Sequence, residues 1–195
     1  MAAGCGHAEA PPPASGAASS GSAVAGGSAP AATPAGLDAT EALCRPVDTG
    51  EIHARLRGAV DAEIDWTPPA TPQCLGGPRP TGDGLRLVYK GRAGADPLLL
   101  IVGIAIGEDA RSARNVGASV TIVREGAGQF FATQGDDKCA MDTVTQEPLP
   151  AADGRYRLSG RGYCTQPARA VGTDGGAVLV SRFDVAAVVE YPGEH

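Results

Sequence analysis

The sequence predicts a mainly β protein, an antiparallel β-sandwich of about seven strands preceded by two short helices, with a small barrel as the alternative. Two observations lead to this fold class. From residue 85 onward, apolar or alternating segments of strand length follow one another, and turn residues separate them. The 195 residues also include 28 Gly and 16 Pro, which is too many for a coiled coil or a helical repeat.

Residues 6–36 consist almost entirely of Ala, Gly, Pro and Ser. A segment without large apolar side chains buries nothing that would offset the entropy of ordering it. We therefore expect residues 1–36 to be a disordered tether and residues 37–195 to form a single domain closed by disulfides. A chain of 195 residues agrees with one domain and an extension.

Two helices are expected at the start of this domain. The spacing Asp-x-x-Glu occurs at residues 38–41 and again at 48–51, as in a capping box. Pro46 must end the first helix. The second is predicted to span about residues 49–65, because one apolar stripe recurs at every fourth position. The residues of this stripe are Ile52, Leu56, Val60 and Ile64. An irregular loop rich in Pro and Gly is expected at residues 66–84.

The strand pattern begins after that loop. Seven strands are expected, at residues 85–90, 98–106, 116–124, 129–133, 139–146, 155–164 and 178–191. Residues 98–106 are nearly all apolar, as in a central strand that is covered on both faces. In the last strand, one face is predicted to carry Leu179, Phe183, Val185, Ala187, Val189 and Tyr191.

Four of the five cysteines lie in the domain, and four cysteines allow three pairings. A hairpin centred between residues 151 and 152 places Cys139 opposite Cys164. Opposed Cα atoms in a non-hydrogen-bonded pair lie about 4.5 Å apart, which a disulfide can span. We predict the disulfide Cys139–Cys164 and, by elimination, Cys44–Cys74. Disulfides indicate an oxidising compartment.

The first residues, Ala2-Ala3-Gly4-Cys5, resemble the end of a bacterial lipoprotein signal peptide. In that family a small-residue triplet precedes a cysteine that is acylated and becomes the mature N-terminus. The resemblance implies that Cys5 carries a lipid and that the domain is held in the periplasm. Gly6 rather than Asp follows the cysteine, which by analogy with the family implies attachment to the outer membrane of a Gram-negative bacterium.

Composition disfavours several functions. The net charge of −6 is unsuited to nucleic acid, and the longest apolar stretch, residues 98–106, falls short of the ~20 residues of a membrane span. Of three histidines, only His53 falls in an expected element, on the polar side of the second helix. We therefore do not expect nucleophilic catalysis, which needs a histidine positioned as the base beside a serine or cysteine. We expect no structural zinc and no cofactor, since the chain has neither a CxxC pair nor a phosphate-cradling Gly-rich loop.

The candidate binding residues lie in loops. Trp66, Arg111 and Arg114 are of the types enriched in protein interfaces. The commoner roles for such residues are to close the base of the core, for Trp66 beside Ile64, and to remain solvated, for the two arginines. Asp136 and Asp137 lie between two strands, where they fit an ordinary turn or, with more ligands, a calcium site.

We expect a binding, inhibitor or immunity-type module that acts on a protein or cell-wall partner through its loops. One alternative is an enzyme that cleaves cell-wall glycan with two facing carboxylates. Its candidate acids are Asp136, Asp137, Asp142, Glu147, Asp153 and Asp184. Arg182 shares a strand face with Asp184, as on a solvated outer face. The other alternative is a structural envelope protein.

Overall fold

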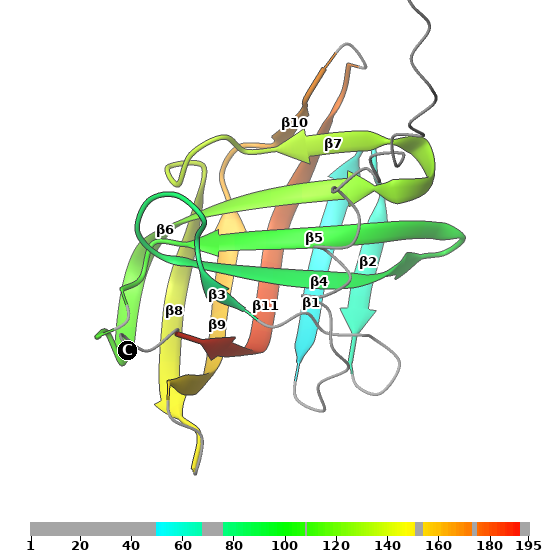
Figure 1. The fold of residues 1–195 in the computed structure, drawn as a ribbon. Coiled ribbons are helices and arrows are strands. Elements are labelled where there is room, and N and C mark those ends of the chain that lie inside the picture. The colour runs from blue at the N-terminus through cyan, green and yellow to red at the C-terminus, as the bar shows by residue number, and fades with distance from the viewer. Residues whose placement is uncertain (1–49, 68–75, 108, 151–153, 173–174, 192–195) are drawn as a thin grey trace, which may run out of the picture. The chain divides into compact units, whose positions relative to one another are not determined.

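The computed structural model describes residues 50–67, 76–107, 109–150, 154–172 and 175–191 (Figure 1). The chain divides into two units, Met1–Pro34 and Ala35–His195, and the described residues all belong to the second. The expected tether, its Cys5, the first helix and the disulfide Cys44–Cys74 lie outside the described residues.

The described part of the chain is built almost entirely of antiparallel strands, as the sequence predicts, and a single 3-10 turn is its helical element. The strands are β1 (Glu51–Gly58), β2 (Ala62–Trp66), β3 (Gly77–Pro78), β4 (Leu85–Ala93), β5 (Asp96–Ile104), β6 (Ser112–Arg124), β7 (Gln129–Ala132), β8 (Cys139–Pro148), β9 (Arg155–Cys164), β10 (Ala168–Ala170) and β11 (Ala177–Glu190), and the turn η1 (Glu125–Ala127) follows β6. All seven predicted strands are present as β4 to β9 and β11. The predicted number of about seven is too low, because the sheet has 11 strands.

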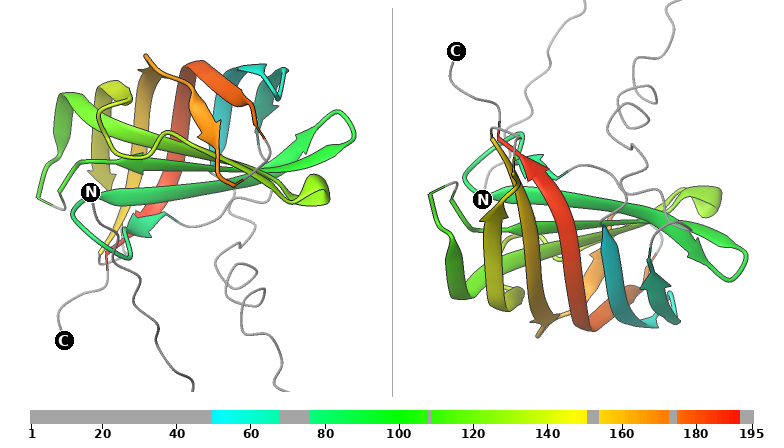
Figure 2. Two further views of the ribbon diagram at one scale, coloured as in Figure 1. Left: turned by 90° about the horizontal axis from the view of Figure 1, so that it is seen from above. Right: turned by 90° about the horizontal axis from the view of Figure 1, so that it is seen from below.

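The strands form two layers that cross at a steep angle. Strands β4, β5, β6 and β7 make the front layer of Figure 1, and β1, β2, β8, β9 and β11 lie behind them (Figures 1 and 2). The layers share hydrogen bonds, since the first half of β6 pairs with β8 while its second half pairs with β5 and β7. The protein is therefore a β-sandwich of the crossed-layer type, in which a long strand passes from one layer to the other.

The predicted helix at residues 49–65 is wrong: this segment forms the hairpin of β1 and β2. A spacing of four residues is even, so it also fits one face of a strand, and Ala54 fills the position between Ile52 and Leu56 on that buried face. Gly58 ends β1 at φ +117°, and a Cβ there would lie 2.3 Å from the Ala177 carbonyl oxygen. The glycine lets the chain leave β1 at a φ that other residues rarely adopt, whereas inside a helix it would cost about 1 kcal/mol relative to alanine.

The last strand is found where predicted, but half of its inward face is shifted by one residue. Val178 and Val180 are buried, whereas Leu179, predicted to share the face of Phe183, is only half-buried. The register explains the shift: Arg55 pairs with Arg182 but the next residue of β1 pairs with Val180, so a β-bulge leaves Ser181 without an opposite residue. Ser181 and Arg182 are consequently both exposed.

The predicted disulfide Cys139–Cys164 is confirmed. The two cysteines are opposed residues of β8 and β9, with Cα atoms 3.9 Å apart. The expected register holds from Cys139 to Met141 and then slips by one residue at Asp142, where β8 bulges. Both cysteines are buried, so the bond lies at the edge of the core.

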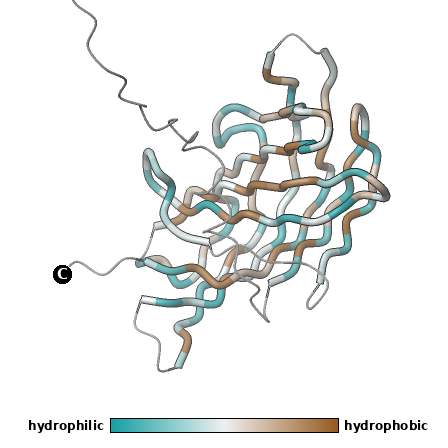
Figure 3. The backbone as a smooth tube through the Cα atoms, turned by 45° about the vertical axis from the view of Figure 1, so that its right-hand side comes forward, coloured by the Kyte–Doolittle hydropathy of each residue, from teal (hydrophilic) through white to brown (hydrophobic). Residues whose placement is uncertain are grey.

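One apolar core fills the space between the layers. Apolar and polar residues alternate along most strands (Figure 3), and the inward set includes Leu100, Ile122 and Phe183. Tyr89 crosses this core and donates a hydrogen bond of 3.0 Å from its hydroxyl to the Ala186 carbonyl oxygen in the other layer. Burial raises the pKa of Tyr89 well above its usual range, so the phenol stays neutral.

Candidate functional site

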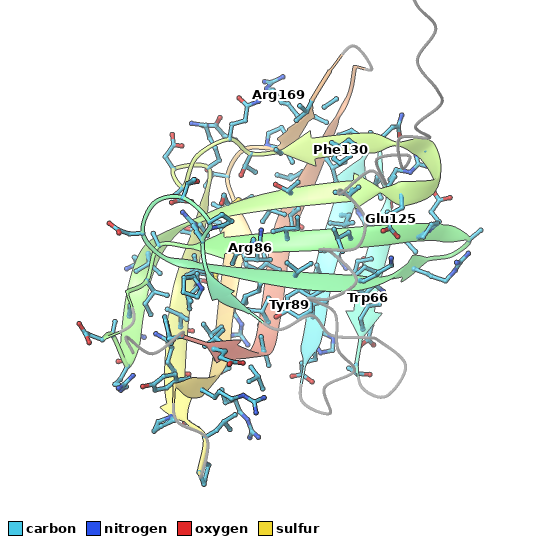
Figure 4. All side chains as sticks on the ribbon, viewed as in Figure 1. Trp66, Arg86, Tyr89, Glu125, Phe130 and Arg169 are labelled. Carbon is cyan, nitrogen blue, oxygen red and sulfur yellow. A yellow bond between two sulfur atoms is a disulfide. The ribbon has the colours of Figure 1, made fainter. Side chains whose placement is uncertain are left out.

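Trp66 belongs to the core. Its side chain is 6% exposed and its indole Nε1 donates a 3.0 Å hydrogen bond to the Arg92 carbonyl oxygen of β4 (Figure 4). A Cβ on Gly91 would lie 2.4 Å from the indole, so the glycine lets β4 pass directly over the ring. Trp66 thus lies where β2 packs on β4. Of the two roles that the sequence suggests for it, the structure supports closing the core and not binding.

Arg111 and Arg114 do not converge with the other candidates. The Arg111 guanidinium carbon lies 4.6 Å from the centre of the Tyr156 ring, a cation–π contact, and its Nη2 donates a 3.3 Å hydrogen bond to the Tyr156 hydroxyl. Arg114 is exposed on β6, where it pairs with Thr143 of β8. Arg111 therefore contacts β9 and Arg114 lies beside β8, and neither of these contacts involves the loop of Asp136.

Asp136 is one half of a clamp between two loops. Its carboxylate accepts hydrogen bonds from Arg79 Nη1 at 2.6 Å and Nη2 at 2.8 Å, a bidentate pair that joins the loop before β8 to the loop after β3. Gly103 and Gly117 make room for it, because a Cβ would lie 2.7 Å from Arg79 Nη2 at the first and 2.7 Å from the Asp136 carbonyl oxygen at the second. Asp137 points to solvent and contacts Lys138.

Hydrogen bonds from Arg79 hold the pKa of Asp136 below its usual range, against the opposing effect of partial burial. A carboxyl group with a lowered pKa favours an ion pair over general-acid catalysis, which needs a proton at working pH. Asp136 therefore serves the fold, since it fixes the loop that follows β3.

The clamp predicts a pH-dependent stability. Because the folded-state pKa of Asp136 lies below the unfolded value of about 3.9, the stabilisation is complete above that value and is lost as the pH falls through the folded-state pKa. We expect Asp136→Asn to lower the free energy of unfolding by about 1–2 kcal/mol at pH 7, and the difference from the parent to shrink towards pH 2. Urea unfolding at pH 7, 4 and 2.5 measures this, with the exposed Asp137→Asn as control. A difference that is undiminished at pH 2.5 would refute the ion pair.

A groove of about 580 Å³ lies over the outer face of β2, β1 and β11. Consecutive cross-strand partners build its first row, Asp65 on β2, His53 on β1 and Asp184 on β11, and Arg161 on β9 extends the row. The second row consists of Glu63, Arg55 and Arg182 on β2, β1 and β11. The β-bulge adds Ser181 to the wall.

The charges of the groove are arranged in contacting pairs. His53 Nδ1 lies 3.0 Å from Asp65 Oδ1, Arg55 Nε donates to Glu63 Oε1 at 2.7 Å, and Arg161 Nε donates to Asp184 Oδ1 at 2.6 Å. The hydrogen bond to Asp184 raises the pKa of Arg161. Arg182 Nε is also 3.5 Å from Asp184 Oδ2, with a side chain 68% exposed.

This arrangement suits binding better than glycan hydrolysis. Glu63 and Asp184 each contact a guanidinium, and Asp65 contacts the imidazole of His53. A glycosidase instead needs one carboxyl group that holds a proton for the leaving group. Each guanidinium retains donors beyond those it uses, because arginine has five N–H groups in a rigid plane. The groove therefore presents fixed charges of both signs to a partner.

Sequence reasoning missed the groove as a site. It noticed Arg182 and Asp184 on one strand face, but it assigned His53 to a helix and so could not align β1 with β11. A usable signal is present in the sequence: His53, Arg55 and Arg57 face Asp65, Glu63 and Asp61 in mirror order around residue 59. Opposite charges in that order are typical of cross-strand pairs in a hairpin.

Within the described ranges, no group of three or more His, Cys, Asp or Glu side chains is placed to hold a metal ion. The same part of the chain contains no helix that is long and apolar enough to cross a membrane. Comparison with known proteins gave no match: no family model, no curated protein and no solved structure is similar to this chain.

Proposed function

We propose that this protein is a periplasmic binding module of the inhibitor or immunity type, which captures a protein partner in the charged groove. The groove carries the proposal, because two rows of ionic side chains cross three strands of one sheet face there. Exposed ion pairs stabilise a fold by only about 0–1 kcal/mol each. Stability alone therefore does not explain such a concentration of them, whereas recognition of a charged partner does.

The proposal includes the N-terminal anchor. The support is the likeness of Ala2-Ala3-Gly4-Cys5 to a lipoprotein signal and the Ala/Gly/Pro/Ser composition of residues 6–36, which suits a flexible tether. The Cys139–Cys164 disulfide supports an oxidising compartment such as the periplasm. A lipid on Cys5 and a tether of this length would hold the module at the outer membrane while it meets its partner.

The groove is tested by reversing its charge in the full chain. Arg55→Glu with Arg182→Glu places negative charge beside Glu63 and Asp184, and we expect capture of the partner from an envelope extract to fall at least tenfold. Capture by the parent should weaken as NaCl is raised from 50 to 500 mM. Arg114→Glu on β6 is the matched control and should capture normally. If the groove variant captures the partner as well as the parent does, the groove is wrong, and loss of capture in Arg114→Glu would then favour the exposed face of β6.

The anchor is tested in cells that express the full-length protein. Cys5 should incorporate labelled fatty acid, and Cys5→Ser should move the protein from the membrane to the soluble fraction. Ser15→Ala is the matched control within the same segment and should leave fractionation unchanged. If the Cys5→Ser protein stays in the membrane fraction and the parent takes up no label, the lipid anchor is wrong, and the groove can still be judged separately.

A further inference from the structure

A pocket of about 180 Å³ lies on the outer face of the front layer. Outward residues of β4, β5 and β6 form its floor, and the loop of residues 79–84 between β3 and β4 forms its wall. This loop passes in front of the layer in Figure 1. We call the feature the Arg86 pocket after the cation on its floor. The charged groove lies on the other layer, so the two are separate (Figure 2).

The floor of the pocket is open because glycines lie on both sides of Arg86. Arg86 points outward from β4, since its chain neighbours Leu85 and Leu87 are buried in the core (Figure 4). The register places Gly77 of β3 on one side of it and Gly103 of β5 on the other. A charged residue on a sheet is often matched by an opposite charge across the strand, which a glycine cannot supply. Space therefore remains beside the guanidinium.

The wall of the pocket is held in place by Arg79. The Arg79 amide donates to the Gly84 carbonyl oxygen at 3.0 Å, and its side-chain Nε donates to the Leu85 carbonyl oxygen at 3.3 Å. Its guanidinium also forms the bidentate pair with Asp136, at 2.6 and 2.8 Å. All these contacts are internal to the protein. The wall is therefore in position before a ligand enters, and binding need not order it.

The two arginines of the pocket differ in their partners. The charge of Arg79 is neutralised by Asp136. Arg86 is half-buried, yet no carboxylate among the residues that the structure describes pairs with it. Shielding part of an unpaired charge from water costs free energy, which an anion beside it offsets. The pocket thus presents one positive charge that the described part of the chain leaves unmatched.

We propose that the Arg86 pocket binds a carboxylate carried on a short aliphatic chain. The planar guanidinium of Arg86 matches a carboxylate with two parallel hydrogen bonds, and a single unmatched charge suits a monoanion better than a dianion such as phosphate. The Thr121 hydroxyl on the floor can donate a further hydrogen bond, while Ile101 and Pro80 offer apolar surface to the chain. A volume of about 180 Å³ equals that of about six water molecules, so the bound group has only a few carbon atoms.

Such a carboxylate has two possible sources, a free organic acid and a glutamate side chain of another protein. The group that the pocket recognises is the same in both, and only the remainder of the ligand differs. The inference goes beyond the proposed function and does not rest on it, because the pocket and the charged groove share no lining residue.

Titration of nitrogen-labelled full-length protein with butyrate tests the pocket by NMR. We expect saturable shifts of the Arg86 Nε–H signal and of the Gly103 and Thr121 amides, with a dissociation constant in the millimolar range. Butyramide, the uncharged analogue, should shift none of these signals, and inorganic phosphate should bind at least tenfold more weakly than butyrate. No shift at Arg86 with butyrate would overturn the proposal, and so would phosphate binding as tight as that of butyrate.

A blocked amino acid distinguishes the two sources. N-acetylglutamate methylamide has the same carboxylate on a piece of peptide chain. If it shifts the Arg86 signal as strongly as butyrate does, the side chain of a protein can enter the pocket. If butyrate alone binds, the pocket is specific for a free acid. Either result supports carboxylate recognition, whereas the failure of both probes contradicts it.

Variants of the full chain provide the second test. Arg86→Gln should weaken butyrate binding at least tenfold, because it removes the cation. Arg92→Gln is the matched control, since Arg92 lies on the same face of β4 but outside the pocket, and it should bind as the parent does. Thr121→Val keeps the shape of the side chain without its hydroxyl and should weaken binding by a smaller factor. Equal binding by the two arginine variants would contradict the proposal.

The groove variant Arg55→Glu/Arg182→Glu separates this inference from the proposed function. It should bind butyrate as the parent does, because neither substitution lies in the Arg86 pocket. Loss of butyrate binding in this variant, with Arg86→Gln unaffected, would move the carboxylate site to the groove and overturn the assignment to Arg86.

Discussion

Replacing Trp66 by Ala is expected to lower the free energy of unfolding by about 3–5 kcal/mol, since it removes a large buried side chain from a packed core. The indole lies against the backbone of β4 at Gly91 and donates to the Arg92 carbonyl oxygen at 3.0 Å. The variant would lose both the packing and that hydrogen bond, where β2 and β4 meet. Chemical denaturation monitored by circular dichroism measures the loss.

Trp66→Phe separates the two contributions. It keeps an aromatic ring but removes the Nε1 donor, and we expect a smaller loss, about 1–2 kcal/mol. Both variants should capture the partner normally once the folded fraction is corrected for, because Trp66 belongs to the core. If Trp66→Ala is as stable as the parent yet loses capture, the binding role offered by the sequence is correct and the core role is not.

The sequence predicts the fold well where the apolar pattern fits a strand and does not also fit a helix. The apolar run of β5 and the alternating segments of β8 and β9 fit a strand and little else, and all were located within a few residues. The pairing of Cys139 with Cys164 followed from hairpin symmetry alone. Local pattern and turn residues were sufficient in these places because pairing is between neighbours in the chain.

The N-terminal hairpin failed for an identifiable reason. Ile52, Leu56, Val60 and Ile64 satisfy a period of four, which a helix and a strand face share, and the capping-box spacing favoured the helix. The competing evidence lay in the side chains. The pairs 53 and 65, 55 and 63, and 57 and 61 are each equidistant from residue 59, and each combines a basic with an acidic residue. The symmetry argument that predicted the disulfide would have paired these residues across a hairpin. It would thereby have predicted the side of the groove that β1 and β2 form.

The other wall of the groove could not be predicted from local patterns. β1 pairs with β11 across more than a hundred residues of sequence, and the bulge at Ser181 shifts the register between Arg55 and Leu56. The apolar pattern of residues 177–190 does not indicate that Ser181 is an extra residue, because Leu179 is as apolar as Val178 and Val180. Long-range pairing and its irregularities depend on the whole sheet, which is why the sequence placed Asp184 beside Arg182 on one strand but not beside His53 of β1.

Removing the Cys139–Cys164 disulfide by the double substitution Cys139→Ala/Cys164→Ala is expected to lower the free energy of unfolding by about 3–4 kcal/mol, because the bond closes a loop of 25 residues in the unfolded chain. Alanine leaves no unsatisfied hydroxyl at these buried positions, so the loss reports the cross-link. The matched control is Thr145→Ala/Ser159→Ala, which removes a hydroxyl pair 2.9 Å apart between the same two strands and should cost less than about 1 kcal/mol.

Reduction distinguishes this bond from the second predicted disulfide. A thiol reductant should destabilise the parent by at least as much as the double substitution does. Any further loss on reduction of the Cys139→Ala/Cys164→Ala protein must come from another disulfide, and Cys44–Cys74 is the predicted one. A double variant within 1 kcal/mol of the parent would contradict the loop-closure argument, since closing 25 residues removes that entropy whatever the partner of Cys44.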